Sequence, residues 1–278
     1  MKNGVRADVR LVECGMAATR EKARSLIMAG AVYIDDRAVA KPGDIVAPDS
    51  CLTVRKDPNP YVSRGGLKLD KAICAFGIAL NGVTALDIGA STGGFTDCML
   101  HHGAAKVYAL DVGYGQLDWS LRNDPRVVVM ERVNARSMEP EWFESQPGFA
   151  GIDVSFISLR LILPALYPCI KDSGLVVALV KPQFEAGRDK VGKNGVVRDE
   201  RVHCDVLTSL CSFAQQTGFL LCGMEYSPIT GPKGNIEFLL FMQKTPIDGQ
   251  KALSNLEGRA AEVEITVRNA HNALIKNQ

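Results

Sequence analysis

The chain has 278 residues, of which 46% are apolar, and a formal net charge of +1. It is long enough for one large domain or two smaller ones. We expect no membrane span and no secretory signal, because no stretch approaches the roughly 18 consecutive apolar residues of a spanning helix. The eight cysteines include no Cys-x-x-Cys pair, which favours a cytoplasmic protein with free thiols and no metal. The near-neutral charge leaves any nucleic-acid binding to local patches.

The first predicted domain, residues 1–58, combines two short helices with short strands in an α+β arrangement. Thr19 is a plausible N-cap of the second helix, and Gly30 is a plausible stop. The segments AVYIDDRAVA and CLTVR follow as short strands. The prolines and glycines of RKDPNPYVSRGG then break the periodicity, so we place a linker at residues 59–62.

Residues 63–250 alternate predicted strands with predicted helices. The strands are Val83–Ile88, Lys106–Asp111, Val127–Glu131, Gly151–Val154, Leu175–Lys181, Leu220–Tyr226 and Glu237–Met242. The helices include Phe95–His102, Leu159–Tyr167 and Arg198–Thr217. This alternation predicts an α/β fold with a largely parallel sheet covered on both faces, whose ligand lies beyond the carboxyl ends of the strands. Residues 251–278 are predicted to form a helical tail packed on the sheet.

The segment TALDIGASTGGFTDCML, residues 84–100, is predicted to run from a strand through a glycine-rich turn into a helix. Glycines let a ligand approach the backbone closely, and the N-terminus of the helix offers free N–H groups to an anionic group. Asp111 ends the next predicted strand, 17 residues after Gly94. This is near the roughly 20-residue spacing expected for a carboxylate that holds ribose hydroxyls. The pattern therefore predicts a nucleoside cofactor.

The loop reads D-x-G-x-S-x-G-G, which resembles the first motif of class I (Rossmann-like) S-adenosylmethionine-dependent methyltransferases. The resemblance implies S-adenosylmethionine as cofactor, with the loop beside its methionine part and Asp111 on its ribose. Asp87 would orient the loop or the amino group. VMERVNARSM, residues 129–138, resembles the adenine-side strand end, with Asn134 nearby. The residues that this resemblance assigns to the cofactor are Asp87, Gly89, Ala90, Ser91, Gly93, Gly94, Phe95, Asp111 and Asn134.

Four charged residues, Lys68, Asp153, Lys181 and Glu237, follow the linker or lie at the ends of predicted strands. A lone buried lysine is expensive, but two lysines interleaved with two carboxylates neutralise each other. A partly desolvated lysine beside another cation loses its proton more readily and can act as a general base near neutral pH. We therefore expect Lys181 to be a general base.

The order Lys-Asp-Lys-Glu is similar to the catalytic tetrad of the FtsJ-type ribose 2′-O-methyltransferases. By that resemblance Lys181 deprotonates a ribose 2′-hydroxyl, Asp153 and Glu237 hold and tune Lys181, and Lys68 positions the ribose. Other methylations fit less well. DVSF stands where base-amine methyltransferases have an Asn/Asp-Pro-Pro-aromatic motif, and Cys169 lies beyond a predicted helix, where an inert core cysteine is the better interpretation.

RADVRLVECGMAATREKARSLIMAGAVYIDDRAVAKPGDIV is similar to the small RNA-binding module named after ribosomal protein S-four. Its basic helix face is typical of phosphate contacts, and also of an ordinary solvated surface. KPQFEAGRDKVGKNGVVRD, residues 181–199, is predicted to be a glycine-rich flap, whose charges either contact RNA or are simply solvated. The residues expected to contact RNA are Arg6, Arg20, Lys22, Arg24, Arg64, Arg188, Lys190 and Lys193.

An S-four-like module joined to an FtsJ-like domain is the arrangement of the TlyA (haemolysin A-type) family. DIGASTGGFTD, KPQFEAG, VGKNGVVRD and SPITGPKGNIEF extend the resemblance over nearly the whole chain. The family implies 2′-O-methylation of cytidine in 16S or 23S ribosomal RNA, or both, with ribosomal RNA or subunits as partners. Two alternatives stay open, an RNA-binding ribosome-assembly factor and a haemolysin or pore former. The oligomeric state is left open between a monomer and a weak dimer.

Overall fold

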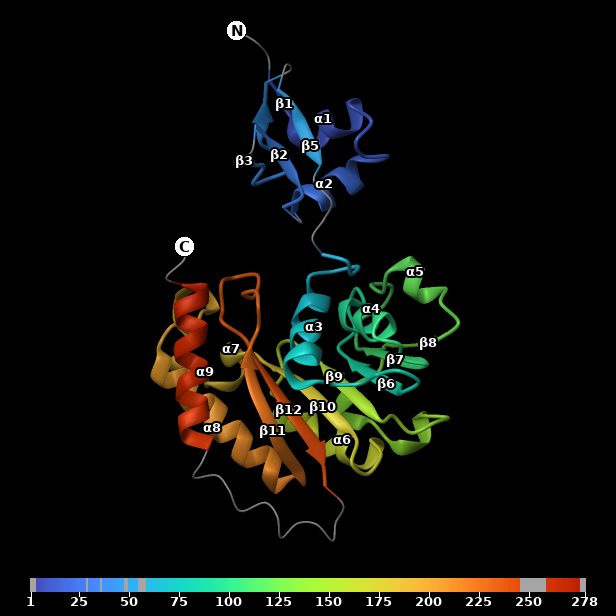
Figure 1. The fold of residues 1–278 in the computed structure, drawn as a ribbon, viewed down its shortest axis with the longest axis vertical. Helices are drawn as coiled ribbons and strands as arrows, with labels where there is room; N and C mark the ends of the chain where they lie inside the picture. Colours follow the sequence, from blue (N-terminus) through green and yellow to red (C-terminus); the bar gives the residue numbers. More distant parts are fainter. Residues whose placement is uncertain are drawn as a thin grey trace. The chain divides into compact units, whose positions relative to one another are not determined.

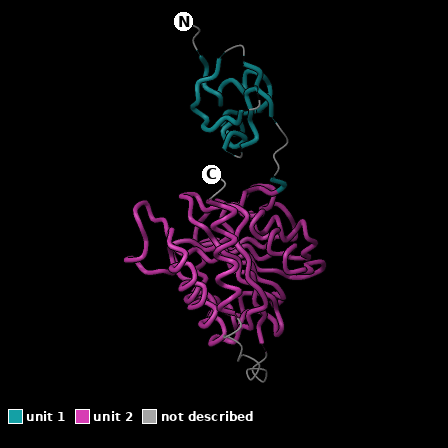
Figure 2. The backbone as a smooth tube through the Cα atoms, turned by 60° about the vertical axis from the view of Figure 1, so that its left-hand side comes forward, with its two compact units in different colours: residues 1–60 teal, residues 61–278 magenta. Residues whose placement is uncertain are grey.

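The computed structural model describes residues 4–28, 30–35, 37–47, 50–54, 59–245 and 259–275. The chain divides into two compact units, residues 1–60 and 61–278 (Figure 2). No helix in these described ranges is long and apolar enough to cross a bilayer.

The first unit is a small α+β domain (Figure 1). Its elements are β1 Val5–Arg6, α1 Ala7–Glu13, α2 Arg20–Met28, β2 Val32–Ile34, β3 Arg37–Ala38, β4 Ile45–Val46 and β5 Leu52–Val54. Strand β2 pairs antiparallel with β3 and β5, and β1 pairs antiparallel with β4. Thr19 caps α2 as expected, because its Oγ1 accepts a hydrogen bond from the Lys22 N–H at 3.1 Å. The β1–β4 pair was not predicted, since two-residue strands leave no periodic signal.

The second unit is built on one seven-stranded sheet, which confirms the predicted α/β class. Its strands are β6 Thr84–Ile88, β7 Lys106–Asp111, β8 Val127–Glu131, β9 Phe149–Ile152, β10 Leu175–Val180, β11 Phe219–Tyr226 and β12 Phe238–Lys244. The order across the sheet is β11-β12-β10-β9-β6-β7-β8. Only β12 runs antiparallel to its neighbours within this sheet, so the remaining carboxyl ends meet at one edge.

Helices cover both faces of this sheet. They are α3 Gly65–Phe76, α4 Gly94–His101, α5 Trp119–Arg122, α6 Leu163–Cys169, α7 Pro182–Glu185, α8 Glu200–Gln216 and α9 Arg259–Leu274, with 3₁₀ turns at Ala135–Ser137, Pro140–Trp142, Leu159–Leu161, Arg188–Lys190 and Lys193–Gly195. One core packs α6, α8 and α9 against the sheet, and the other packs α3, α4 and α5. Because both faces are covered, β10 (LVVALV) is apolar at every position.

The close packing of α4 on the sheet depends on a glycine. A Cβ at Gly151, in β9, would lie 2.7 Å from Met99 Cε and 2.9 Å from Phe95 Cδ2. Both of those side chains belong to α4, which directly follows the glycine-rich turn. The small residue therefore sets how closely the turn approaches the end of β9.

Helix α9 lies within the predicted C-terminal tail, residues 251–278, of which 251–258 and 276–278 are outside the described residues. Val263, Val267 and Ala270 of α9 are buried in the core on the α6–α8 face. His271 Nε2 lies 2.9 Å from Nδ1 of His203 in α8, and both side chains are buried. The helix therefore packs as part of the second unit.

Candidate active site

A pocket of about 350 Å³ lies at the carboxyl edge of the sheet. Its walls come from the start of α3, the glycine-rich turn after β6, the ends of β9 and β10, and the loop between β11 and β12. The lining includes Lys68, Gly89, Asp153, Lys181 and Glu237. The structure thus brings the four charged residues singled out in the sequence together with the glycine-rich turn in one pocket.

The four charged side chains form a chain of alternating sign. Lys68 Nζ donates to Glu237 Oε2 at 2.6 Å and lies 3.9 Å from Asp153 Oδ2. Lys181 Nζ lies 2.5 Å from Asp153 Oδ1. Two ammonium groups and two carboxylates sum to zero formal charge, so each buried charge has a partner of opposite sign.

Local structure explains how these side chains reach the pocket. Lys68 projects from the first turn of α3. Lys181 directly follows β10. The strand does not continue because Pro182 lacks the N–H that a strand needs, and Pro182 instead starts α7. Glu237 directly precedes β12, and its main-chain oxygen accepts from the Ser227 N–H at 2.8 Å. The tetrad is therefore held by elements that lie far apart in the sequence.

Burial dominates the electrostatics of the pocket. It raises the pKa of Glu237 above its ordinary value, while the adjacent Lys68 opposes that rise. The Glu237 side chain is 1% exposed, so its carboxylate depends on Lys68 for the stabilisation that water does not provide. Removing either partner would leave an uncompensated buried charge.

Ser155 is a pocket residue that the sequence analysis missed. Its hydroxyl accepts a hydrogen bond from Lys181 Nζ at 2.8 Å. Two partners, Asp153 and Ser155, therefore fix the direction of the Lys181 amine. The available signal was a polar residue two positions beyond Asp153, three positions after the end of a buried strand.

The glycine-rich turn has the backbone geometry expected of a cradle. Gly89 and Gly93 have φ of +88° and +97°, a region that residues with a Cβ rarely adopt. A Cβ at Gly89 would also lie 2.5 Å from the Asp153 main-chain oxygen. Asp111 lies beside the turn, since its Oδ2 accepts from the Ser91 N–H at 2.7 Å. The turn is thus fixed between β7 and the Asp153 segment.

Asp87, at the end of the same strand as the turn, carries a buried acceptor without a partner. Its Oδ2 accepts from the Thr96 N–H at 2.8 Å and from the Thr96 hydroxyl at 2.6 Å. Among the described residues nothing hydrogen-bonds to Oδ1. Burial raises the pKa of this carboxyl to about 7, the Thr96 bonds oppose the rise, and the negative charges of Asp153 and Asp111 add to it.

The remaining predicted cofactor residues divide into two groups. Ala90, Ser91, Gly94 and Phe95 line the pocket. Asn134 does not belong to its lining. The Asn134 side chain instead caps the turn Ala135–Ser137, where Oδ1 accepts from the Arg136 N–H at 3.1 Å.

In the first unit, Arg6 and Arg20 are engaged by one carboxylate. Asp8 is 1% exposed, and its oxygens lie 3.0 Å from Arg6 Nε and 3.1 Å from Arg20 Nε. These contacts lower the pKa of Asp8 to about 2, chiefly through the hydrogen bond from Arg6. Lys22 and Arg24 are exposed on α2. The predicted RNA-contacting set thus contains two cations that also hold the unit together.

The cations predicted for the second unit lie in two places. Arg64 lines the pocket directly before α3. Arg188, Lys190 and Lys193 are exposed on the segment after α7, and Lys190 Nζ lies 3.2 Å from Asp205 Oδ2. Only the short helix α7 separates Lys181 from this segment, so its charges are close to a pocket residue in sequence.

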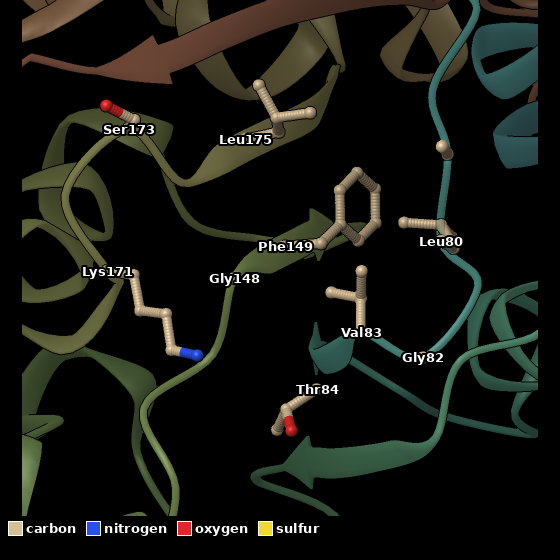
Figure 3. A pocket seen from close by; sticks show the side chains of 10 residues that line it. Leu80, Gly82, Val83, Thr84, Gly148, Phe149, Lys171, Ser173 and Leu175 are labelled. Carbon is tan, nitrogen blue, oxygen red and sulfur yellow. The ribbon is translucent and has the colours of Figure 1, made fainter.

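Figure 3 shows a second pocket, of about 360 Å³, at the amino ends of β6, β9 and β10. Leu80, Val83, Phe149 and Leu175 give it an apolar wall, with Lys171 at its edge. The residues lining it include no acid and no histidine. Acid–base chemistry is therefore concentrated at the opposite edge of the sheet.

A cluster of possible metal ligands lies between α3 and α4. The ligand atoms of Asp70, Cys98 and His102 are within 4.8 Å of one another. His102 Nε2 and Asp70 Oδ1 already share a hydrogen bond of 2.8 Å, and burial raises the pKa of the Cys98 thiol. Hydrogen bonding accounts for this arrangement, and the absence of a metal stays a prediction.

Comparisons with known proteins agree with this division of the chain. The FtsJ-like methyltransferase family matches residues 61–244, and the S4 domain family matches residues 5–50. YqxC of Bacillus subtilis is 52% identical over 270 residues, which cover 97% of this chain and 95% of that protein. The 16S/23S rRNA (cytidine-2′-O)-methyltransferase TlyA of Mycobacterium tuberculosis is 46% identical over 258 residues, covering 92% and 96%. A solved structure from Streptococcus thermophilus that carries a hemolysin name superposes with a TM-score of 0.76 at 45% identity, covering 100% of this chain and 99% of that one.

Proposed function

The chain belongs to the TlyA family of FtsJ-like methyltransferases, and from that premise we propose that it methylates the ribose 2′-oxygen of cytidine in ribosomal RNA, with S-adenosylmethionine as the methyl donor. The observation that carries the proposal is the alternating chain Glu237–Lys68–Asp153–Lys181, which lines the same pocket as the glycine-rich turn. A glycine-rich turn alone serves many nucleotide ligands, whereas a lysine base beside it fits removal of a hydroxyl proton.

Three features of the glycine-rich turn and of the residues around it support S-adenosylmethionine as the cofactor. The positive φ of Gly89 and Gly93 gives the turn a backbone conformation that residues with a Cβ rarely adopt, and Gly89 lets the turn pack against the Asp153 segment. Asp111, beside the turn, offers carboxylate oxygens suited to ribose hydroxyls. The unpartnered Oδ1 of Asp87 suits a cationic or hydrogen-donating group. When bound, S-adenosylmethionine supplies an electrophilic methyl group on a sulfonium sulfur.

Lys181 is the proposed general base for the ribose 2′-hydroxyl. Asp153 and Ser155 fix the direction of its amine at 2.5 and 2.8 Å. With Lys181 neutral the tetrad carries a net charge of −1, and uptake of the 2′-hydroxyl proton by Lys181 restores the zero sum of two ammonium groups and two carboxylates. The contribution of these residues is to hold the Lys181 amine at the ribose 2′-hydroxyl and to remove the proton of that hydroxyl as its oxygen attacks.

The substrate assignment rests on the first unit and on the relatives. The S4 domain match, residues 5–50, covers α2, which carries Arg20, Lys22 and Arg24, and exposed cations of this kind contact phosphates. The M. tuberculosis relative is named for cytidine 2′-O-methylation of 16S and 23S rRNA. We infer ribosomal RNA as the substrate and, from that substrate, a cytoplasmic location. All four tetrad side chains come from one chain, and a monomer or a weak dimer stays the prediction.

Two other functions receive less support. An assembly factor without catalysis has no use for two lysines buried in alternation with two carboxylates, because such an arrangement costs desolvation energy. A membrane-lytic role is suggested by the hemolysin names of three relatives. Nothing in the pocket geometry favours it.

Transfer of radiolabelled methyl groups to isolated 30S and 50S subunits and to naked ribosomal RNA tests the proposal. We expect incorporation into RNA, with nuclease mapping placing the label on the 2′-oxygen of cytidine. Comparing 2′-O-methyl marks in cells with and without the protein identifies the sites. Absence of incorporation into every form of ribosomal RNA, with cofactor bound, would overturn the proposal.

A further inference from the structure

The side chain of Asn235 joins two loops beside the proposed active site. Asn235 is 2% exposed and lies two residues before Glu237. Its Oδ1 accepts from the Val197 N–H at 2.9 Å, and its Nδ2 donates to the Gly195 main-chain oxygen at 2.9 Å. Both ends of one carboxamide are therefore committed to residues 192–197, called the flap turn below.

The flap turn has a backbone that needs external support. Asn194 and Gly195 have φ of +66° and +76° in succession. The turn closes on itself through the Gly192 N–H, which donates to the Val196 oxygen at 3.1 Å. Consecutive residues in the left-handed region are unfavourable for a chain of L-amino acids, particularly where one of them is not glycine. The two Asn235 bonds therefore hold a conformation that the turn itself does not favour.

The main chain of Asn235 fixes the wall of the pocket at the same time. Its carbonyl oxygen accepts from the Gly231 N–H at 2.9 Å. A Cβ at Gly231 would lie 2.7 Å from Glu237 Oε1, so this backbone packs directly on the tetrad carboxylate. Thr230 and Pro232, on either side of Gly231, line the pocket. One buried residue thus connects the flap turn with the pocket wall.

We propose that Asn235 is a positioning residue that fixes the flap turn for RNA before RNA binds. This inference rests on the proposed function. Lys193 lies in the flap turn and is exposed, and Lys233 is exposed on the wall loop. Cations held in one arrangement lose less conformational entropy when they bind phosphates, which raises affinity without adding a contact.

The chemistry of the site specifies a neutral amide. The acceptor end of Asn235 meets an N–H group, and the donor end meets a carbonyl oxygen. An aspartate would keep the first bond but place a carboxylate oxygen against the Gly195 oxygen, which repels it. An alanine removes both bonds and leaves the Val197 N–H without its partner.

The test compares Asn235→Ala and Asn235→Asp with Gln216→Ala, which removes an exposed amide bonded to Ser212 at the end of α8. We expect both Asn235 variants to raise the KM for ribosomal RNA on the order of tenfold. The turnover number and the affinity for S-adenosylmethionine should stay within about twofold of wild type. Trypsin should cleave the intact variants after Lys193 about tenfold faster, because local opening limits that cleavage.

A double-mutant cycle with Lys193→Ala separates positioning from general destabilisation. If Asn235 acts by holding the flap turn, Lys193→Ala should cost less RNA affinity in the Asn235→Ala background than in wild type. Additive losses would overturn the proposal, and so would an unchanged KM with unchanged trypsin cleavage. A loss confined to the turnover number would mean that Asn235 positions Glu237 and not the flap turn, and this result would also overturn the proposal.

Failure of the proposed function gives a different pattern. In that case the wild-type chain itself transfers no methyl group to ribosomal RNA. Trypsin cleavage and the double-mutant cycle measured on RNA affinity do not require methyl transfer. Both measurements therefore still test the role of Asn235. Wild-type rates of trypsin cleavage and wild-type RNA affinities in the Asn235 variants would reject that role.

Discussion

The tetrad pocket of the second unit and the arginine pair of the first unit both join cations to carboxylates, but they differ in solvation. The side chains of Lys68 and Lys181 are each 10% exposed. Those of Arg6 and Arg20 are 46% and 58% exposed around the buried Asp8. A buried charge depends on its protein partner, whereas an exposed cation retains water and salt as alternatives. Single substitutions should therefore have much larger effects in the pocket than in the first unit.

Lys181→Ala should produce the largest effect. We expect methyl transfer to fall at least about 10³-fold, because the variant lacks the proposed general base. Affinity for S-adenosylmethionine and for RNA should change little, as measured by calorimetry and filter binding. The matched control is Lys171→Ala, an exposed lysine at the opposite edge of the sheet, which should transfer normally. Normal methyl transfer by Lys181→Ala would show that Lys181 is not the general base and would rule out the proposed mechanism.

Glu237→Gln should have the second-largest effect. We expect a loss in turnover of roughly 10²-fold, because the substitution removes the carboxylate that Lys68 contacts most closely. Wild-type activity should fall as the pH drops through the raised pKa of Glu237, where the carboxylate gains a proton. The variant should lack that step in its pH profile. Glu225→Gln is the control, since it breaks the more exposed pair with Lys71 at 3.3 Å and should cost less than threefold. Equal losses in the two variants would contradict the comparison of buried and exposed pairs.

Asp87 should make the stability of the second unit depend on pH. Its folded pKa, about 7, lies above the ordinary value of 3.8, so between these values the unfolded chain releases a proton that the folded chain keeps. Stability should therefore fall as the pH rises from about 4 to about 7, by at most about 4 kcal/mol at 1.36 kcal/mol per unit. Chemical denaturation at several pH values measures this slope, which Asp87→Asn should flatten. The exposed cap Asp118→Asn should preserve it.

Asp8 should give the first unit the opposite slope. Its folded pKa, about 2, lies below the ordinary value of 3.8. Its stabilising effect is therefore complete above about pH 4 and is lost as the pH falls towards 2. Asp8→Asn should lower the melting temperature of the first unit at pH 7 and remove this acid dependence. Glu13→Gln, which breaks the Arg10 pair at 3.4 Å, should change melting by little. If wild type and Asp8→Asn showed identical acid transitions, Asp8 would not be the source of the acid dependence of this unit.

The smallest effects should come from the exposed cations of α2. We expect Lys22→Ala and Arg24→Ala each to weaken binding of ribosomal RNA by a few-fold. Each should also reduce the slope of log affinity against log salt concentration by about one if it contacts a phosphate. Salt titrations of RNA binding check this. An unchanged slope would identify the side chain as part of an ordinary solvated surface.

Much of the fold followed from local patterns. LVVALV before Lys181 and Pro182 predicted a strand buried on both faces, and the structure places β10 at Leu175–Val180. Thr19 predicted the start of α2. These features depend on periodicity, turn chemistry and backbone preference within a few residues, so they can be read from neighbouring positions. The β1–β4 pair escaped because each strand has only two residues.

The sequence by itself determined the element order, the glycine-rich turn and the identity of the charged residues. Only the tertiary structure decided that Lys68 meets Glu237, which lies 169 residues away. It likewise decided that Ser155 orients Lys181, that one Asp8 holds two arginines, and that Asn235 bridges two loops. The physical reason is that pairing between distant side chains depends on how strands and helices pack. No local periodicity records that packing.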